Sequence, residues 1–250
     1  MPGDYSILAP IYDTIRLNAY VAQIIPRIMD YAQSRDWAGR RIMVLGCGTG
    51  TAVEYLNQYT YMVQGVDSSS DMLEAARSKS SNAGTGIRWI QADIREALNF
   101  NTTDLVLALN CLNEVNSLRD LELIFANVKQ TLEPGKLFIF DLQTVKGLIE
   151  INESGTQLVY DNPKSLMVVT TSEYDFERHS LTIFFRIFQR SGDAWKRTEA
   201  RQILRGFPIQ AVATLLQRSG LKLKTLLSQD LIAYDAGTSD ARRVIFIVES

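Results

Sequence analysis

The stretch VLGCGTGTAVEYL, residues 44–56, constrains the fold of this chain more than any other segment. An apolar run ends at three closely spaced glycines, Gly46, Gly48 and Gly50, and a helical pattern begins directly after them. Glycine adopts positive φ angles and lets another group approach the main chain closely, and the N-terminus of a helix favours an anionic group. We therefore predict a strand–turn–helix unit in which a ligand contacts the bare backbone of the turn.

Strands and helices alternate along the first part of the chain. Five apolar runs have the length and composition of buried strands, at 40–46, 62–67, 87–93, 104–110 and 134–142. Helical patterns precede or separate them, at 17–35, 51–59, 71–80 and 118–132. Strands spaced by helices form βαβ units, and such units build a parallel sheet with helices on both faces.

The pattern changes after the fifth of these strands. Three further strands joined by short polar turns are expected at 166–174, 181–190 and 195–207, as in an antiparallel meander. A helix at 209–220 and two strands at 221–227 and 242–250 follow. We predict an α/β fold with a doubly wound, seven-stranded, mostly parallel sheet and an antiparallel β insertion.

This reading divides the chain into a main domain and one inserted segment. Residues 1–149 and 206–250 form the main domain, with an N-terminal helical lead-in. Residues 150–205 form the insertion. The insertion either caps the active site and selects the substrate or, as the alternative, mediates a homodimer.

Composition argues against several classes of partner. The formal net charge is −2 without a dense basic block, which argues against nucleic acid as the main partner. No apolar run approaches the roughly 20 residues of a membrane span. One histidine and two cysteines, Cys47 and Cys111, are too few for most zinc sites, and we predict no metal. The cysteines are expected to be reduced thiols of a cytoplasmic protein, unless the fold brings them together as a pair.

Polar residues gather where the predicted strands end. In open α/β sheets, ligands bind beyond the C-terminal ends of the strands. The polar residues at those positions are Asp67, Asp93, Asn110, Asn113, Glu114 and Asp141. Asp67 stands about 20 residues after Gly46, where a carboxylate accepts both hydrogens of a ribose diol. A ligand that carries a nucleoside is therefore expected.

The glycine pattern separates two kinds of nucleoside-binding enzyme. The dinucleotide fingerprint is G-x-G-x-x-G, whereas this chain has G-x-G-x-G, with Thr51 in place of the third glycine. The segments VLGCGTG, GVDSSSDMLEAAR and QADI resemble, in order and spacing, the cofactor motifs of the class I S-adenosylmethionine-dependent methyltransferases. The resemblance covers residues 38–145 strongly and 206–250 moderately. The segment YSILAPIYDTI at 5–15 resembles the lead-in of the small-molecule branch of that family.

This resemblance implies S-adenosyl-L-methionine as the cofactor. The residues that it assigns to cofactor binding are Gly46, Cys47, Gly48, Gly50, Asp67, Ser68, Met72, Asp93, Ile94 and Asn110. Asp67 would hold the ribose hydroxyls, Asp93 would accept from the adenine amine, and Asn110 would sit near the methyl group. Ser68 would flank the adenine, and the backbone N–H of Ile94 would face a ring nitrogen.

Candidates for catalysis are fewer than those for cofactor binding. Glu114 could serve as a base for the acceptor, or be only a solvated or capping carboxylate. Tyr12 and Asn110 could line the reacting centre, and packing is the alternative for Tyr12, as it is for Tyr5. The only histidine, His179, lies in a polar hairpin turn.

A series of arginines offers one further candidate site. Arg197, Arg201 and Arg205 recur on one predicted strand and could bind an acidic substrate. A solvated face with Glu199 as an ion-pair partner is the alternative that we favour.

The leading functional hypothesis is methyl transfer to nitrogen or oxygen of a small-molecule acceptor. An NAD(P)-dependent oxidoreductase is the first alternative, and it needs the third glycine that this chain lacks. A non-catalytic methyltransferase-fold partner subunit is the second alternative. Such a subunit could lose the cofactor residues, which are intact here.

Overall fold

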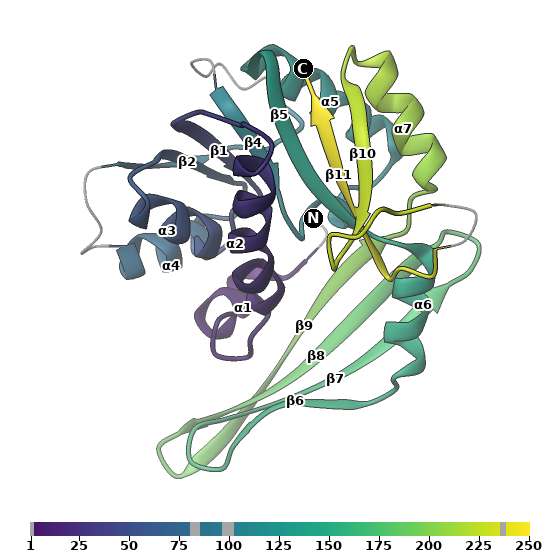
Figure 1. The fold of residues 1–250 in the computed structure, drawn as a ribbon. Coiled ribbons are helices and arrows are strands. Elements are labelled where there is room, and N and C mark those ends of the chain that lie inside the picture. Colours follow the sequence, from purple (N-terminus) through teal and green to yellow (C-terminus); the bar gives the residue numbers. More distant parts are fainter. Residues whose placement is uncertain (1–2, 81–85, 97–102, 236–238) are drawn as a thin grey trace.

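A computed structural model describes residues 3–80, 86–96, 103–235 and 239–250. Figure 1 shows a main sheet between two layers of helices and a long second sheet that projects from one end of it. The fold class predicted from the sequence is confirmed: seven strands form the main sheet in the order β10-β11-β5-β4-β1-β2-β3. No described helix is long and apolar enough to cross a membrane.

The main sheet is built around strands buried on both faces. Its strands are β1 (Arg41–Leu45), β2 (Met62–Asp67), β3 (Ile87–Gln91), β4 (Thr103–Ala108), β5 (Leu132–Gln143), β10 (Lys222–Ser228) and β11 (Arg243–Glu249). β11 runs antiparallel to both of its neighbours, β5 and β10, whereas β1 to β5 pair in parallel. Every residue of the central strand β4 is buried. The carboxyl ends of the parallel strands therefore meet at one edge, where the site is expected.

Helices cover both faces of this sheet. The helices of the main domain are α2 (Ala19–Gln33), α3 (Thr51–Gln58), α4 (Ser70–Ser80), α5 (Leu118–Thr131) and α7 (Ile209–Arg218). α2, α3 and α4 pack on one apolar cluster through Ile24, Val53 and Leu73. α5 and α7 pack on the opposite cluster through Phe125 and Leu216. The two clusters hold the strand ends at fixed positions.

The second sheet has one strand more than the sequence predicted. Its antiparallel order is β6-β7-β8-β9, with β6 (Gln157–Asn162), β7 (Leu166–Asp175), β8 (Ser180–Ser191) and β9 (Ala194–Arg205). A helix that was also not predicted, α6 (Val145–Glu153), leads into it. β6 is an edge strand whose residues are exposed or half-buried, so it shows no apolar alternation from which it could be predicted.

The start of the chain lies against the second sheet. This N-terminal segment, residues 3–18, contains α1 (Tyr5–Leu8) and the 3-10 helix η1 (Ala9–Ile11). Leu8, Ile11 and Ile15 join a buried cluster with Phe185 and Ile187 of β8. Gly3 also forms an isolated antiparallel bridge with Gln202 of β9. The N-terminal segment thus links the second sheet to the main domain.

Candidate functional site

The glycine loop between β1 and α3 contains three glycines with different surroundings. All three have positive φ angles: 59° at Gly46, 53° at Gly48 and 85° at Gly50. A Cβ atom at Gly46 would lie 2.5 Å from Cβ of Cys111, and one at Gly50 would lie 2.6 Å from the ring of Trp89. A Cβ atom at Gly48 would meet nothing within 4 Å. Two glycines are therefore required by packing, and Gly48 is the one that faces open space.

A cavity of about 40 Å³ lies at this loop. Its lining includes the predicted site residues Tyr12, Gly46, Cys47, Gly48 and Asn110. Asn18, Val21, Thr49, Thr51 and Leu109 complete it. The structure thus brings the loop, the end of β4 and the N-terminal segment together around one space.

Asp67 lies at the end of β2 beneath the glycine loop. Its carboxylate accepts from the backbone N–H of Gly48 at 2.8 Å and from that of Ser69 at 2.9 Å. Within the described residues no lysine or arginine forms an ion pair with it. Burial raises the pKa of Asp67, and the two N–H donors oppose this rise. Asp67 therefore both holds the loop and keeps acceptor capacity for further donors.

The remaining predicted adenine contacts lie around the ends of β2 and β3. The carboxylate of Asp93 accepts from the guanidinium of Arg95 at 2.9 Å, and this ion pair lowers the pKa of Asp93. Ile94 is half-buried and Ser68 is exposed. Met72 is buried in α4, and its backbone N–H donates to the hydroxyl of Ser69. The assignment of these residues to the cofactor stays a prediction.

Asn110 is fixed by a buried ion pair that the sequence analysis missed. Its φ angle is 56°, a left-handed conformation that asparagine tolerates. Its N–H donates to Asp141 at 2.8 Å, and its side-chain oxygen accepts from Arg243 at 2.9 Å. Arg243 pairs with the fully buried Asp141 and lies 3.9 Å from the ring centroid of Tyr20. The side chain of Asn110 is therefore held in one orientation at the cavity wall.

Polar contacts join the N-terminal segment to the glycine loop. The Asp13 carboxylate accepts from the hydroxyl of Thr49 at 2.6 Å and from the ammonium of Lys79 at 2.5 Å. The amide of Asn18 donates to Thr51 at 3.0 Å. These contacts hold the segment over the loop.

Glu114 belongs to a cluster of side chains from three distant parts of the chain. It ends the 3-10 helix η2 (Leu112–Glu114) after β4. The hydroxyl of Tyr5 donates to Oε1 of Glu114, and the amide of Gln202 donates to the same oxygen at 2.8 Å. Gln202 also donates to the Tyr5 hydroxyl at 3.0 Å. We name this group the Tyr5–Glu114–Gln202 cluster.

The surroundings of Glu114 raise the pKa of its carboxyl group. Burial raises its pKa from 4.5 to about 7, the charge of Asp67 adds to this rise, and the two hydrogen-bond donors oppose it. The ring of Tyr12 lies 6.5 Å from that of Tyr5. Burial raises the pKa of both tyrosines, so they are neutral at pH 7. A carboxyl group that titrates near neutral pH is suited to exchange protons with a ligand.

Asn113, the neighbour of Glu114, has a bracing role. Its amide nitrogen donates to the carbonyl of Gln143 at 3.0 Å and to that of Arg205 at 2.7 Å. The N–H of Gln143 donates back to its side-chain oxygen at 2.8 Å. The buried Asn113 therefore ties the ends of β5 and β9 together beside Glu114.

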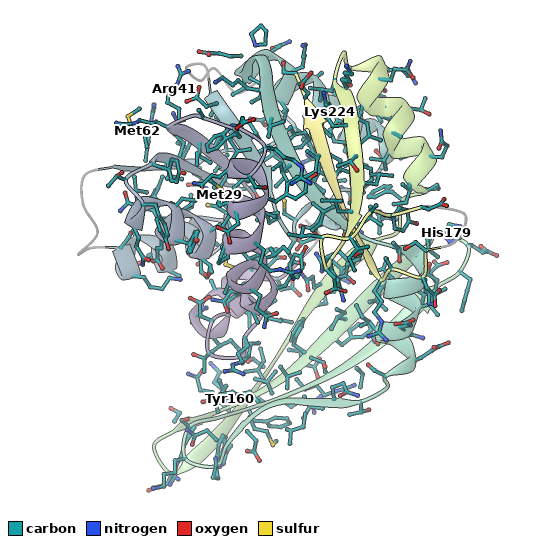
Figure 2. All side chains as sticks on the ribbon, in the orientation of Figure 1. Met29, Arg41, Met62, Tyr160, His179 and Lys224 are labelled. Atoms are coloured by element: carbon teal, nitrogen blue, oxygen red, sulfur yellow. The ribbon has the colours of Figure 1, made fainter. Side chains whose placement is uncertain are left out.

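Other sequence candidates lie away from this site. His179 is exposed in the β7–β8 turn, with a φ angle of 47°, and Figure 2 shows it on the outside of the molecule. Arg197 pairs with Glu199, as the solvated-face interpretation predicts. Cys47 and Cys111 are free thiols whose pKa values are raised by burial, so they form no pair. Among the described residues, no cluster of histidine, cysteine and carboxylates could hold a metal ion.

Comparison with known proteins finds methyltransferases and also, at 29% identity over 154 residues, a carboxy-S-adenosyl-L-methionine synthase of Campylobacter curvus, which covers 58% of this chain and 61% of that protein. Residues 42–135 match the family model described as a methyltransferase domain. A putative methyltransferase of Bacillus subtilis, YqeM, is 26% identical over 213 residues, which cover 81% of this chain and 85% of that protein. The matched family region contains the glycine loop, Asp67, Asp93 and Asn110.

Solved structures share the fold over nearly the whole chain. An S-adenosylmethionine-dependent methyltransferase from Clostridium acetobutylicum superposes with a TM-score of 0.81 at 21% identity, covering 98% of both chains. A structure of CalS10, an amino pentose methyltransferase from Micromonospora echinaspora with S-adenosylmethionine bound, has a TM-score of 0.69 at 16% identity. It covers 96% of this chain and 97% of that one.

Proposed function

The chain belongs to the class I S-adenosylmethionine-dependent methyltransferases, and from this premise we propose that its acceptor is a small molecule methylated at nitrogen or oxygen. The family match argues against the oxidoreductase alternative, and the intact cofactor residues argue against a non-catalytic partner subunit. The cofactor supplies a methyl carbon bound to a positively charged sulfur, and the protein supplies binding and orientation. The family match does not identify the acceptor.

The residues at the glycine loop fit S-adenosylmethionine. Gly48 leaves open space where a side chain would stand, so a ligand can reach the backbone there. Asp67 lies directly beneath, with acceptor capacity and no ion-pair partner in the described part of the chain. Hydroxyl groups of a ribose would donate to such a carboxylate. Asn110 would hold its place at the wall of the same cavity.

We infer from the size of the cavity that the N-terminal segment moves when a ligand binds. The cavity of about 40 Å³ is far below the roughly 300 Å³ at which pockets for ligands of this size begin. Tyr12 and Asn18 of the N-terminal segment form part of its wall. Displacement of that segment would enlarge the cavity on the side that Tyr12 and Asn18 now close. We expect the segment to open for entry and to close over the bound molecules.

The observation that carries the proposal is the enclosure of Glu114. Tyr5 of the N-terminal segment and Gln202 of the second sheet both contact it, so its carboxylate is covered from two sides. An enclosed site accommodates a small molecule better than a folded protein or a duplex. The fold is shared with an enzyme named as an amino pentose methyltransferase, which supports a small acceptor. The second sheet would select the acceptor through Gln202 and its neighbours.

The test is a methyl-transfer assay with acceptor pools of different size. The protein is incubated with methyl-labelled S-adenosylmethionine and with small-molecule, RNA or protein fractions of a bacterial extract. We expect label in the small-molecule fraction alone. Label only in RNA or protein would overturn the proposal. Calorimetry with S-adenosylhomocysteine, and with NAD as the control, checks that the cofactor site is formed.

A further inference from the structure

We propose that the acceptor is an amine that binds as its ammonium ion, and that Oε2 of Glu114 receives the proton from its nitrogen. This inference rests on the proposed function, because it assigns the acceptor side of the same site. It is carried by the arrangement of charges and rings around Glu114.

One oxygen of the Glu114 carboxylate is free for a ligand. Tyr5 and Gln202 both donate to Oε1. Within the described residues no hydrogen bond reaches Oε2, and Oε2 is not one of the buried side-chain atoms that lack a partner. It is therefore open to solvent or to a bound molecule. The two donors fix the carboxylate so that Oε2 points to one place.

The surroundings of Glu114 favour a positive charge. In the described part of the chain no lysine or arginine forms an ion pair with Glu114, and the nearby Asp67 adds a second negative charge. The other titratable groups that interact with Glu114 are Tyr5, Tyr12 and Cys111, and burial raises the pKa of each, so all three are neutral at pH 7. A carboxylate beside two aromatic rings attracts an ammonium ion through charge and cation–π contact.

A neutral or anionic acceptor would make fewer favourable interactions with Glu114 than an ammonium ion. A hydroxyl group would not compensate the buried negative charge, and a carboxylate would be repelled by it. Arg201 is adjacent to Gln202 on β9, so its side chain points to the opposite face of the sheet. Arg243 is already engaged by Asp141 and Asn110. Arg201 and Arg243 therefore offer no anion site beside Glu114.

Methyl transfer to an ammonium nitrogen requires the loss of one proton, and Glu114 would accept that proton. One N–H proton of the ammonium ion passes to Oε2, which becomes a carboxylic acid, and the nitrogen regains its lone pair. That lone pair forms the new bond to the methyl carbon, and the electron pair of the broken carbon–sulfur bond stays on sulfur. A general base with a pKa near the working pH contributes most to such a step, and the pKa of Glu114 is about 7.

The experiment compares Glu114→Gln with the matched variant Glu199→Gln. The control makes the same change from glutamate to glutamine at an exposed position, because Glu199 lies on the exposed face of β9, where it pairs with Arg197. A small-molecule extract is separated by cation exchange at pH 7, and each fraction is incubated with methyl-labelled S-adenosylmethionine. Mass spectrometry then assigns the label to nitrogen or oxygen. Rates against pH and calorimetry with S-adenosylhomocysteine are measured for each variant.

We expect label on nitrogen, in products of the retained fraction. Glu114→Gln should lower kcat/KM at pH 7 at least about 100-fold, remove the rise of kcat/KM toward pH 7, and change the Kd for S-adenosylhomocysteine less than twofold. Glu199→Gln should behave as the wild type. Should Glu114→Gln not fold, Glu114→Asp replaces it, and a reduced rate with the pH rise retained is expected.

Three results would overturn the inference. Label on oxygen or in the unretained fraction contradicts an amine acceptor while the proposed function stands. A wild-type rate and pH profile in Glu114→Gln, or in Glu114→Asp if it is used, contradicts the role of the carboxylate. An absence of label from every small-molecule fraction, with S-adenosylhomocysteine still bound, overturns the proposed function itself and the inference with it.

Discussion

Alanine substitution at the loop glycines should separate stability from ligand binding. Gly50→Ala would place a Cβ atom 2.6 Å from Cη2 of Trp89 and 3.1 Å from Cβ of Ala76, at a φ angle of 85°. Gly48→Ala has a similar backbone conformation, with a φ angle of 53°, but its Cβ atom would meet nothing within 4 Å. The backbone strain is therefore shared by both variants, whereas the clash belongs to Gly50→Ala alone.

The structure sets the expected magnitudes. A non-glycine residue in the left-handed region costs about 1–2 kcal/mol, and overpacking of a buried site costs a further 1–3 kcal/mol or so. We expect Gly50→Ala to lower the free energy of unfolding by about 2–5 kcal/mol and Gly48→Ala by about 1–2 kcal/mol. The Kd for S-adenosylhomocysteine should rise at least about tenfold in Gly48→Ala, which corresponds to about 1.4 kcal/mol, because the new Cβ atom takes up space at the cofactor loop.

Gly192→Ala provides the matched control. Gly192 lies in the β8–β9 turn with a φ angle of 62°, and a Cβ atom there would also meet nothing within 4 Å. Urea unfolding and calorimetry with S-adenosylhomocysteine are compared for the three variants. If Gly48→Ala binds the cofactor product as well as Gly192→Ala does, the space above Gly48 is not part of the site. If Gly50→Ala is as stable as Gly192→Ala, the packing argument is wrong.

Three further predictions concern charged groups. Asp67→Asn should weaken S-adenosylhomocysteine binding by roughly 1.5–3 kcal/mol per charge-assisted hydrogen bond lost, and an unchanged Kd in calorimetry would leave Asp67 only its role in holding the loop. Arg243→Leu leaves Asp141 buried without its cation, so urea unfolding should show a loss of roughly 3–5 kcal/mol, and a loss below about 1 kcal/mol would contradict this reading of the ion pair. The folded state raises the pKa of Glu114 from 4.5 to about 7, so the neutral form stabilises the fold and this contribution is lost as the pH rises through 7. At about 1.36 kcal/mol per pH unit the full effect is about 3 kcal/mol, and the solvent access of Oε2 reduces it. The difference in unfolding free energy between wild type and Glu114→Gln should therefore change by about 1–3 kcal/mol between pH 4 and pH 8. A difference that stays constant with pH would refute this prediction.

The parallel core could be predicted because its signals are local. Each buried strand of the main sheet is a short apolar run, and each run is bounded by turn residues or a helical pattern, so β1 to β5 were found within a few residues of their ends. β6 gave no such signal, because an exposed edge strand needs no apolar face. α6 was missed as well, although Thr144 caps it by accepting from the N–H of Gly147 at 3.0 Å.

Sequence reasoning could place the glycine loop, Asp67 and Glu114 at one edge of the sheet, but it could not identify the side chains that contact Glu114. The glycine loop and Asp67 form a motif with fixed spacing along the chain. The Glu114 partners lie far away, 109 residues for Tyr5 and 88 for Gln202, and no local pattern marks them. The different surroundings of Gly46, Gly48 and Gly50 could be distinguished only in the structure, because all three look alike in the sequence and all have positive φ angles.

The docking of the N-terminal segment on β8 and β9 has a consequence for the order of assembly during synthesis. Tyr5 and Gln202 are 197 residues apart, so the ribosome makes the segment long before it makes the partners of the segment. At about 5–20 residues per second, its aliphatic side chains wait roughly 10–40 s for their sheet. Leu8, Ile11 and Ile15 are thus available to chaperones throughout that interval. A nascent chain can form the glycine loop well before it can form the Tyr5–Glu114–Gln202 cluster, because that cluster needs Gln202 of β9 to have left the ribosome.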